Sequence, residues 1–115
     1  MRHEESRIQQ ACVKWFRLQY PRFKLNLFAV PNGGLRGKFE AAIMKMEGVT
    51  AGVADLLFLF PSKGYHGLCI EMKTAKGKQQ ATQKEWQKTI EQCGYKYVIC
   101  RSFDDFKTEI SAYLF

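Results

Sequence analysis

Several features that define other classes of protein are missing from this sequence. No apolar run is long enough to span a membrane, and the polar first ten residues lack the apolar core of a secretion signal. The four cysteines are Cys12, Cys69, Cys93 and Cys100. They do not form the C-x-x-C pairs typical of zinc sites, so we expect small buried apolar residues in a reducing compartment, with a disulfide as the alternative. These absences favour a soluble cytoplasmic protein.

Acidic residues are scarce compared with basic ones. The chain has 18 Lys and Arg against 11 Asp and Glu, and the net charge of +7 favours a polyanionic partner. A merely soluble basic protein is the alternative, because the positive charges are scattered rather than gathered in one run. The chain has 115 residues, 46% of them hydrophobic, with no internal repeat or linker, so we expect residues 1–115 to form one globular domain.

Apolar periodicity and turn residues predict eight elements. They are a helix over 3–20, a strand over 25–30, a helix over 38–47, strands over 54–60 and 68–72, a helix over 83–93, a strand over 97–100 and a last helix. Thr82, with Glu85 at capping-box spacing, is the expected start of the third helix. Ser102 or Asp104 is expected to cap the last one. This order predicts an α/β fold, a mixed sheet covered on both faces.

The stretch from Gly48 to Lys73 carries the strongest functional signal. Its two apolar runs are joined by a segment with one proline and two glycines, which predicts a hairpin. Because side chains alternate along a strand, antiparallel pairing brings Asp55 close to Glu71 or Lys73 at one end of the sheet. Two buried carboxylates without cations would be costly, so the cluster predicts a metal site. A turn aspartate and an ordinary Glu71–Lys73 ion pair are the alternative.

Polar groups in the first helix are also candidates. Glu5 and Gln9 lie one turn apart on the face that carries Cys12 and Phe16, so we expect them to point toward the interior. Glu4 is the alternative to Glu5. Acids favoured only by the helix dipole are the other interpretation.

A glycine-containing loop follows the first predicted strand. Gly33 and Gly34 allow close approach of a ligand, while Asn32, Arg36 and Lys38 offer hydrogen-bond donors suited to phosphate. A plain surface turn is the alternative for the two glycines.

Taken together, these motifs match a known pattern. They are Glu5-x-x-x-Gln9, V-P-N-G-G at 30–34 with Arg36, G-V-x-A-G-V-A-D at 48–55, I-E-M-K at 70–73, and K-G-K at 76–78 followed by Gln83 and Trp86. In this order and over nearly the whole chain, they resemble the VRR-NUC (virus-type replication-repair nuclease) domains of the PD-(D/E)XK nuclease superfamily. Ala54 stands where the superfamily's name has proline, a position whose side chain takes no part in the chemistry.

The resemblance implies a metal-dependent DNA endonuclease that hydrolyses phosphodiester bonds. Branched or Holliday-junction-like DNA is the expected substrate, in phage or bacterial replication and repair. Oxygen ligands suit Mg²⁺ or Mn²⁺, and the expected set is Asp55, Glu71, the backbone carbonyl of Met72, and Glu5 directly or through water. Lys73 would orient or deprotonate the attacking water or stabilise the phosphorane-like charge, and Gln83 would hydrogen-bond Lys73 or the water. The expected DNA-binding residues are Asn32, Gly33, Gly34, Arg36, Lys38, Lys76 and Lys78.

Two further expectations concern partners. Phe23, Leu27, Phe28, Phe39 and Ile43 exceed what one small sheet face and a short helix need, which, with the resemblance, predicts a homodimer. Completion of the core is the alternative.

A non-catalytic module that recognises DNA shape is the alternative function, and an RNA-binding protein is a third, although no aromatic platform motif supports it.

Overall fold

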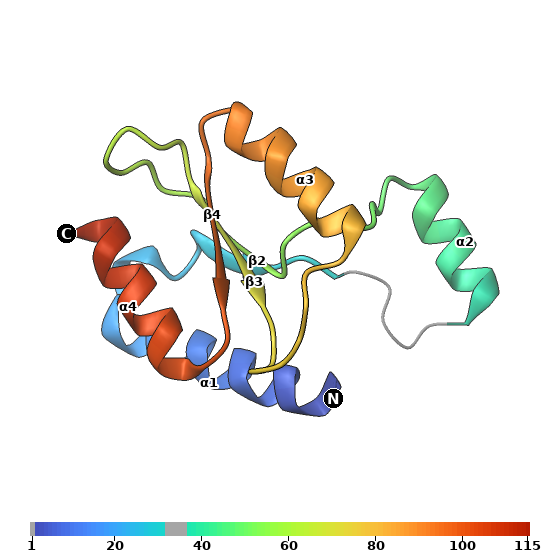
Figure 1. Ribbon diagram of the computed structural model, residues 1–115. Coiled ribbons are helices and arrows are strands. Elements are labelled where there is room, and N and C mark those ends of the chain that lie inside the picture. The colour runs from blue at the N-terminus through green and yellow to red at the C-terminus, as the bar shows by residue number, and fades with distance from the viewer. Residues whose placement is uncertain (1, 32–36) are drawn as a thin grey trace.

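The computed structural model describes residues 2–31 and 37–115, and its order of elements is the predicted one (Figure 1). The elements are α1 (Arg2–Gln19), the 3-10 turn η1 (Pro21–Phe23), β1 (Leu27–Ala29), α2 (Lys38–Met46), β2 (Leu56–Phe58), β3 (Leu68–Met72), α3 (Ala81–Gln92), β4 (Lys96–Cys100) and α4 (Phe103–Leu114). The first two strands are shorter than predicted. Residues 24–26 form a turn between η1 and β1. Leu59 and Phe60 lie beyond the end of β2, although the Leu59 amide still donates to the Asn26 carbonyl.

The sheet is mixed, as predicted, with strand order β1-β2-β3-β4. β1 with β2 and β2 with β3 are antiparallel, so the predicted hairpin is confirmed. β4 runs parallel to β3, with Glu71 opposite Ile99 and Met72 opposite Cys100. The start of β2 and the carboxyl ends of β3 and β4 therefore meet at one edge of the sheet.

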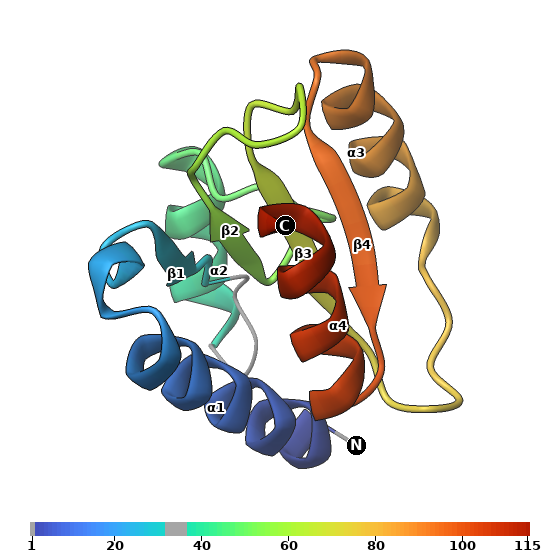
Figure 2. The same ribbon diagram turned by 90° about the vertical axis from the view of Figure 1, so that its left-hand side faces the viewer.

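The two sheet faces are covered by different helices. α1 and α4 lie side by side over one face (Figure 2), and their core partners from the strands are Leu27, Leu56, Phe58, Leu68, Ile70, Met72, Val98 and Cys100. On the other face, Cys69 and Tyr97 pack with Trp86 and Ile90 of α3. Since successive side chains alternate, Glu71 faces the same side as Cys69, toward α3.

The start of α3 differs from the prediction. The N-cap is Gln80, and Gln83 completes its capping box, so the prediction of Thr82 as the cap with Glu85 as its capping-box partner was wrong. Thr82 instead lies inside the first turn, where its carbonyl packs so closely on Gly52 that an added Cβ there would overlap it. Gly52 has a φ of 92°, a conformation that suits glycine. For α4, Ser102 is the cap, and its hydroxyl accepts a hydrogen bond from the Asp105 amide.

α2 stands away from the sheet (Figure 1), and none of its residues is buried. Phe39 and Met46 are each 80% exposed. Among the apolar residues that the sequence offered for an interface, Phe23 and Leu27 belong to the core, whereas Phe28, Phe39 and Ile43 are exposed. The surplus of apolar side chains thus lies on α2 and on the outer strand.

The cysteine prediction was right for three positions and wrong for one. All four thiols are free, and Cys12, Cys69 and Cys100 are buried. Cys93 is exposed because it is the C-cap residue of α3, where the chain turns at Gly94 on the surface. Within the described part of the chain, no helix is long and apolar enough to cross a membrane.

Candidate active site

Two carboxylates meet where β2 begins and β3 ends. Asp55 directly precedes β2, and the β2–β3 register continues to place it opposite Glu71. Its Oδ2 accepts a hydrogen bond of 2.7 Å from the Met72 amide, while its backbone carbonyl accepts one of 2.9 Å from the Val30 amide. Backbone on both sides therefore fixes Asp55, and the strand order positions it beside Glu71.

Glu71 is 3% exposed and is held through both carboxylate oxygens. The Gln83 amide donates to Oε2 at 2.9 Å, and the Tyr97 hydroxyl lies 3.4 Å from Oε1. The Lys73 Nζ lies 4.0 Å from Oε2. A carboxylate buried this deeply needs such partners, because burial without them would favour a neutral side chain.

The electrostatics of the pair favour a shared proton when no cation is bound. Burial first, then the negative charge of Asp55 and a hydrogen bond between the two carboxyl groups, raise the pKa of Glu71 from 4.5 to about 8. The Lys73 ammonium and the Tyr97 hydroxyl oppose this rise in pKa. Two carboxylates at such a short separation cannot both ionise easily, and a divalent cation between them would relieve the repulsion.

Lys73 is buried with only 7% of its surface exposed, and its amide donates to the Cys100 carbonyl. The loop after it folds back: a Cβ on Gly77 would lie 3.2 Å from Thr74 Oγ1 and 3.5 Å from Lys73 Cδ. Arg101 holds this loop from β4's end, where its Nη1 donates to the carbonyls of Thr74 at 2.9 Å and Gly77 at 2.6 Å. The loop that presents Lys76 and Lys78 to solvent is therefore tied to the sheet.

The structure does not bring every predicted residue to this pair. Glu5 and Gln9 are partly exposed rather than interior, and Glu4 is exposed, because the first turns of α1 precede the part of that helix that enters the core at Cys12. Among the described residues, no three His, Cys, Asp or Glu side chains gather as a metal-binding group, so Glu5 does not complete a triad with Asp55 and Glu71. Lys38 is exposed at the start of α2. Asn32, Gly33, Gly34 and Arg36 lie outside the described residues.

The donor set of the pair fits a hard divalent cation. Asp55 and Glu71 supply carboxylate oxygens, and the Met72 carbonyl belongs to the same strand end. Mg²⁺ and Mn²⁺ prefer oxygen ligands, and Mg²⁺ usually keeps several waters when one or two carboxylates hold it. Two protein carboxylates are thus sufficient for a site of this kind, without a third from α1.

Sequence reasoning missed Tyr97 and Arg101 as parts of this site. Tyr97 belongs to an apolar strand, and its link to Glu71 depends on the parallel pairing of β3 with β4, which brings together residues 26 positions apart. Arg101 follows that strand and contacts a loop 24 to 27 positions earlier. For Arg101 a signal was its position directly after the carboxyl end of β4, where β3 also ends, whereas Tyr97 is the second residue of β4, opposite Cys69.

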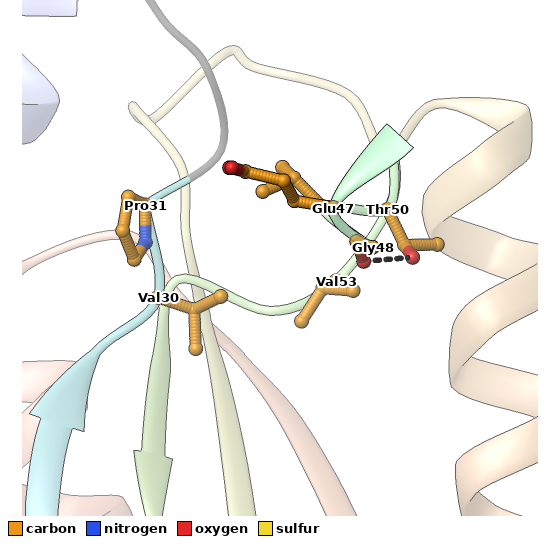
Figure 3. Close-up of a pocket in the computed structure, with 7 residues that line it drawn as sticks. Val30, Pro31, Glu47, Gly48, Thr50 and Val53 are labelled. Carbon is orange, nitrogen blue, oxygen red and sulfur yellow. Dashed lines mark hydrogen bonds between the residues drawn. The ribbon is translucent and has the colours of Figure 1, made fainter. Parts of the chain in front are cut away.

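A shallow hollow of about 320 Å³ lies beside Asp55. In Figure 3, Val30 and Val53 face each other across it, and the Thr50 hydroxyl donates to the Gly48 carbonyl along its wall. The remaining lining residues are Pro31, Glu47 and Val49. One lining residue, Val30, donates its amide to the Asp55 carbonyl, which connects the wall of the hollow to the backbone of the site.

Comparisons with known proteins identify the family of the chain. No curated protein matches the chain. A solved structure described as a VRR_NUC domain protein superposes with a TM-score of 0.82 at 27% identity, over 95% of this chain and 86% of the other. The model of the VRR-NUC domain matches residues 2–104. The chain therefore belongs to the VRR-NUC family of nuclease domains.

Proposed function

We propose that this protein is a Mg²⁺- or Mn²⁺-dependent endonuclease that hydrolyses DNA phosphodiester bonds. The observation that carries the proposal is the pairing of Asp55 with buried Glu71, with the Lys73 ammonium 4.0 Å from the latter. A raised carboxyl pKa beside a second carboxylate and a buried lysine is a pattern found at functional sites. A module that only recognised DNA shape would need the basic loops but not this pair.

The proposed roles follow from the positions of the side chains. Asp55, Glu71 and the Met72 carbonyl hold the cation, which when bound polarises the scissile phosphate and lowers the pKa of a water. Lys73 orients the attacking water or stabilises the negative charge that develops on the phosphorus oxygens. Gln83 keeps Oε2 of Glu71 in place through its 2.9 Å hydrogen bond. Glu5 contributes at most through an intervening water.

The proposed grip on DNA is electrostatic. Lys76 and Lys78 are exposed on the loop that leaves Lys73, so they flank the site and meet the phosphate backbone without reading bases. The other proposed DNA-binding residues are Asn32, Gly33, Gly34, Arg36 and Lys38. A grip on backbone alone suits substrates defined by shape, such as branched or four-way DNA in phage or bacterial replication and repair.

The test is a cleavage assay on defined DNA structures. Supercoiled plasmid and linear, flap, splayed and four-way DNAs are incubated with Mg²⁺, Mn²⁺ or EDTA. We expect cleavage with either metal, none in EDTA, and faster cleavage of the branched DNAs. DNA binding without cleavage in either metal would favour the shape-recognition alternative, and full cleavage in excess EDTA would contradict a metal-dependent site.

A second part of the proposal is that the working unit is a homodimer formed through α2. A helix of nine residues is marginal in water unless an apolar face packs on something, yet no residue of α2 is buried within one chain. Phe39, Ile43 and Met46 are four and three residues apart, so they form one apolar stripe. A second protein surface would cover such a stripe more favourably than DNA phosphates would.

The charges beside this stripe support a second copy as its partner. Glu40 and Glu47 are seven residues apart and lie along one edge, while Lys38 and Lys45 lie along the other. In a parallel two-fold pair of α2 helices, the acidic edge of each would face the basic edge of the other. One short sequence is thus complementary to itself, which suits two active sites acting on paired strands of a junction.

A further inference from the structure

Tyr97 is a buried tyrosine whose hydroxyl the packing does not require. It is 6% exposed in β4, and its ring packs against Trp86 of α3 with centroids 6.1 Å apart. Phenylalanine would fill the same space. A buried hydroxyl costs free energy unless it is hydrogen-bonded, so its partners indicate its role.

A chain of hydrogen bonds fixes the direction in which the Tyr97 hydroxyl points. The Gln87 amide nitrogen donates to the Glu91 carboxylate at 3.2 Å, which leaves Gln87 Oε1 as an acceptor. Gln79 Nε2 donates to that oxygen at 2.7 Å and to the Tyr97 oxygen at 3.3 Å. With its oxygen accepting from Gln79, the Tyr97 hydroxyl has its own proton available for Oε1 of Glu71, 3.4 Å away.

We propose that Tyr97 is a positioning residue that, together with Gln83, holds the Glu71 carboxylate in the orientation that binds the metal. Gln83 donates to Oε2 and Tyr97 to Oε1, so each oxygen has one neutral donor and keeps a lone pair for a cation. This inference rests on the proposed function, since it assigns Tyr97 a part in that metal site. Groups that orient metal ligands from behind in this way typically change metal affinity or activity 10- to 100-fold when removed.

The Tyr97–Glu71 contact is long enough to become shorter. At 3.4 Å the Tyr97–Glu71 separation exceeds that of a usual O–H···O bond. Hydrogen bonds to an ionised carboxylate are shorter and stronger than those to neutral groups. The Tyr97 hydroxyl therefore stabilises the carboxylate form of Glu71, which is the form that can bind a cation.

The test compares Tyr97→Phe with the matched control Tyr95→Phe. Tyr95 packs on the same sheet face, with its ring against His66, away from the carboxylate pair. Calorimetric titration with Mn²⁺ alone measures binding, and cleavage is followed against Mn²⁺ concentration. We expect Tyr97→Phe to bind Mn²⁺ about 10-fold more weakly, to recover cleavage at high Mn²⁺ and to keep the wild-type KM for DNA. Tyr95→Phe should keep the wild-type Mn²⁺ affinity and cleavage.

A second variant keeps the test decisive if Tyr97→Phe fails to fold. Gln79→Leu removes the donor that orients the Tyr97 hydroxyl, and Gln79 is partly exposed on a loop. We expect a smaller loss of Mn²⁺ affinity in the same direction. If both variants fold and bind Mn²⁺ as tightly as an active wild-type protein does, the role of Tyr97 is overturned and the proposed function is not. No Mn²⁺ binding and no cleavage by the wild-type protein would overturn the proposed function, and this inference with it.

Discussion

Asp55 Oδ2 accepts a hydrogen bond of 2.7 Å from the backbone amide of Met72, which directly follows Glu71. This contact holds the carboxylates of Asp55 and Glu71 side by side. The contact depends on three features of the sequence together: an acid just before β2, an acid next to the end of β3, and a hairpin of the right register between them. The pair is therefore a product of topology rather than of any local motif.

The first prediction is that cleavage needs both acids, Asp55 and Glu71, and also Lys73. Asp55→Asn, Glu71→Gln and Lys73→Ala should each lower the cleavage rate by about 100-fold or more, because each removes a charge that binds the cation or meets the developing charge. Plasmid nicking under single-turnover conditions measures the rate, and circular dichroism verifies folding. Glu85→Gln, an exposed acid on α3, is the control. Undiminished nicking by folded Asp55→Asn would contradict the assignment.

The second prediction concerns stability without metal. The pKa of Glu71 is raised from 4.5 to about 8, so between these values the folded state binds more protons than the unfolded state. Stability contributed by the protonated group is therefore full below about pH 4.5 and is lost as the pH rises toward 8. The melting temperature in EDTA should fall over this window.

A variant separates this effect from other titrating groups. Glu71→Gln cannot titrate, so its melting temperature should fall less between pH 5 and pH 8 than that of the wild-type protein. Mg²⁺ should restore wild-type stability most at pH 8, since a cation replaces the proton between the carboxylates. Parallel melting curves for both proteins in EDTA would show that Glu71 is not the group responsible.

The features that sequence patterns could predict are local or depend on alternation. Apolar runs with a proline and glycines between them predicted the hairpin, and the period of two then placed Asp55 near Glu71. Ser102 as the α4 cap follows from the same local logic. These signals involve residues close together in the sequence, so they can be recognised without knowing which distant segments come into contact.

The features that sequence patterns could not predict depend on contacts between distant segments. Tyr97 reaches Glu71 only because β4 pairs with β3 in parallel, and α3 starts at Ala81, two residues earlier than predicted, with the Thr82 carbonyl packed on Gly52. Likewise, the pattern on α1 placed Glu5 on the core-facing side, but among the described residues no third acidic, histidine or cysteine side chain joins Asp55 and Glu71. Periodicity gives a direction on a helix and no distance from another element.

The third prediction is that DNA binding weakens steeply with salt. The net charge of +7 and the exposed Lys76 and Lys78 favour binding through phosphates, so log Kd should rise linearly with log salt concentration. Fluorescence anisotropy with Ca²⁺ in place of Mg²⁺ measures this on uncut DNA. Lys76→Ala with Lys78→Ala should reduce the slope by about two contacts. A slope near zero would indicate stacking or base contacts instead.

The fourth prediction is that one thiol is reactive in the folded protein. Burial raises the pKa of Cys12 and Cys100 to about 12 and that of Cys69 to about 11, so these thiols stay protonated and shielded. Cys93 is exposed. A chromogenic disulfide reagent should titrate one thiol under native conditions, none in Cys93→Ser, and four in denaturant for the wild-type chain. Rapid reaction of several thiols in the folded protein would contradict the burial of the other three.

The last prediction is that the protein dimerises through α2. Light scattering at micromolar concentration should give about twice the 13.3 kDa chain mass. Phe39→Ser should shift this toward the mass of one chain, because Phe39 is an aromatic member of the apolar stripe, is 80% exposed and does not belong to the core. The matched control is Leu25→Ser, which removes a 90% exposed apolar side chain outside α2 and should leave the dimer intact.

The activity of these variants decides whether the dimer matters for function. A two-fold pair of sites should cut symmetry-related strands of a four-way junction, so Phe39→Ser should lose paired incisions on junctions while still nicking plasmid, whose single strands need one site. Cleavage products resolved strand by strand on denaturing gels distinguish the two. The proposed catalytic residues lie at the start of β2 and the end of β3, outside α2, so the chemistry in each chain should survive the substitution. A wild-type protein that stays monomeric at high concentration and still makes paired incisions would contradict the dimer, because separate chains would then suffice for both cuts.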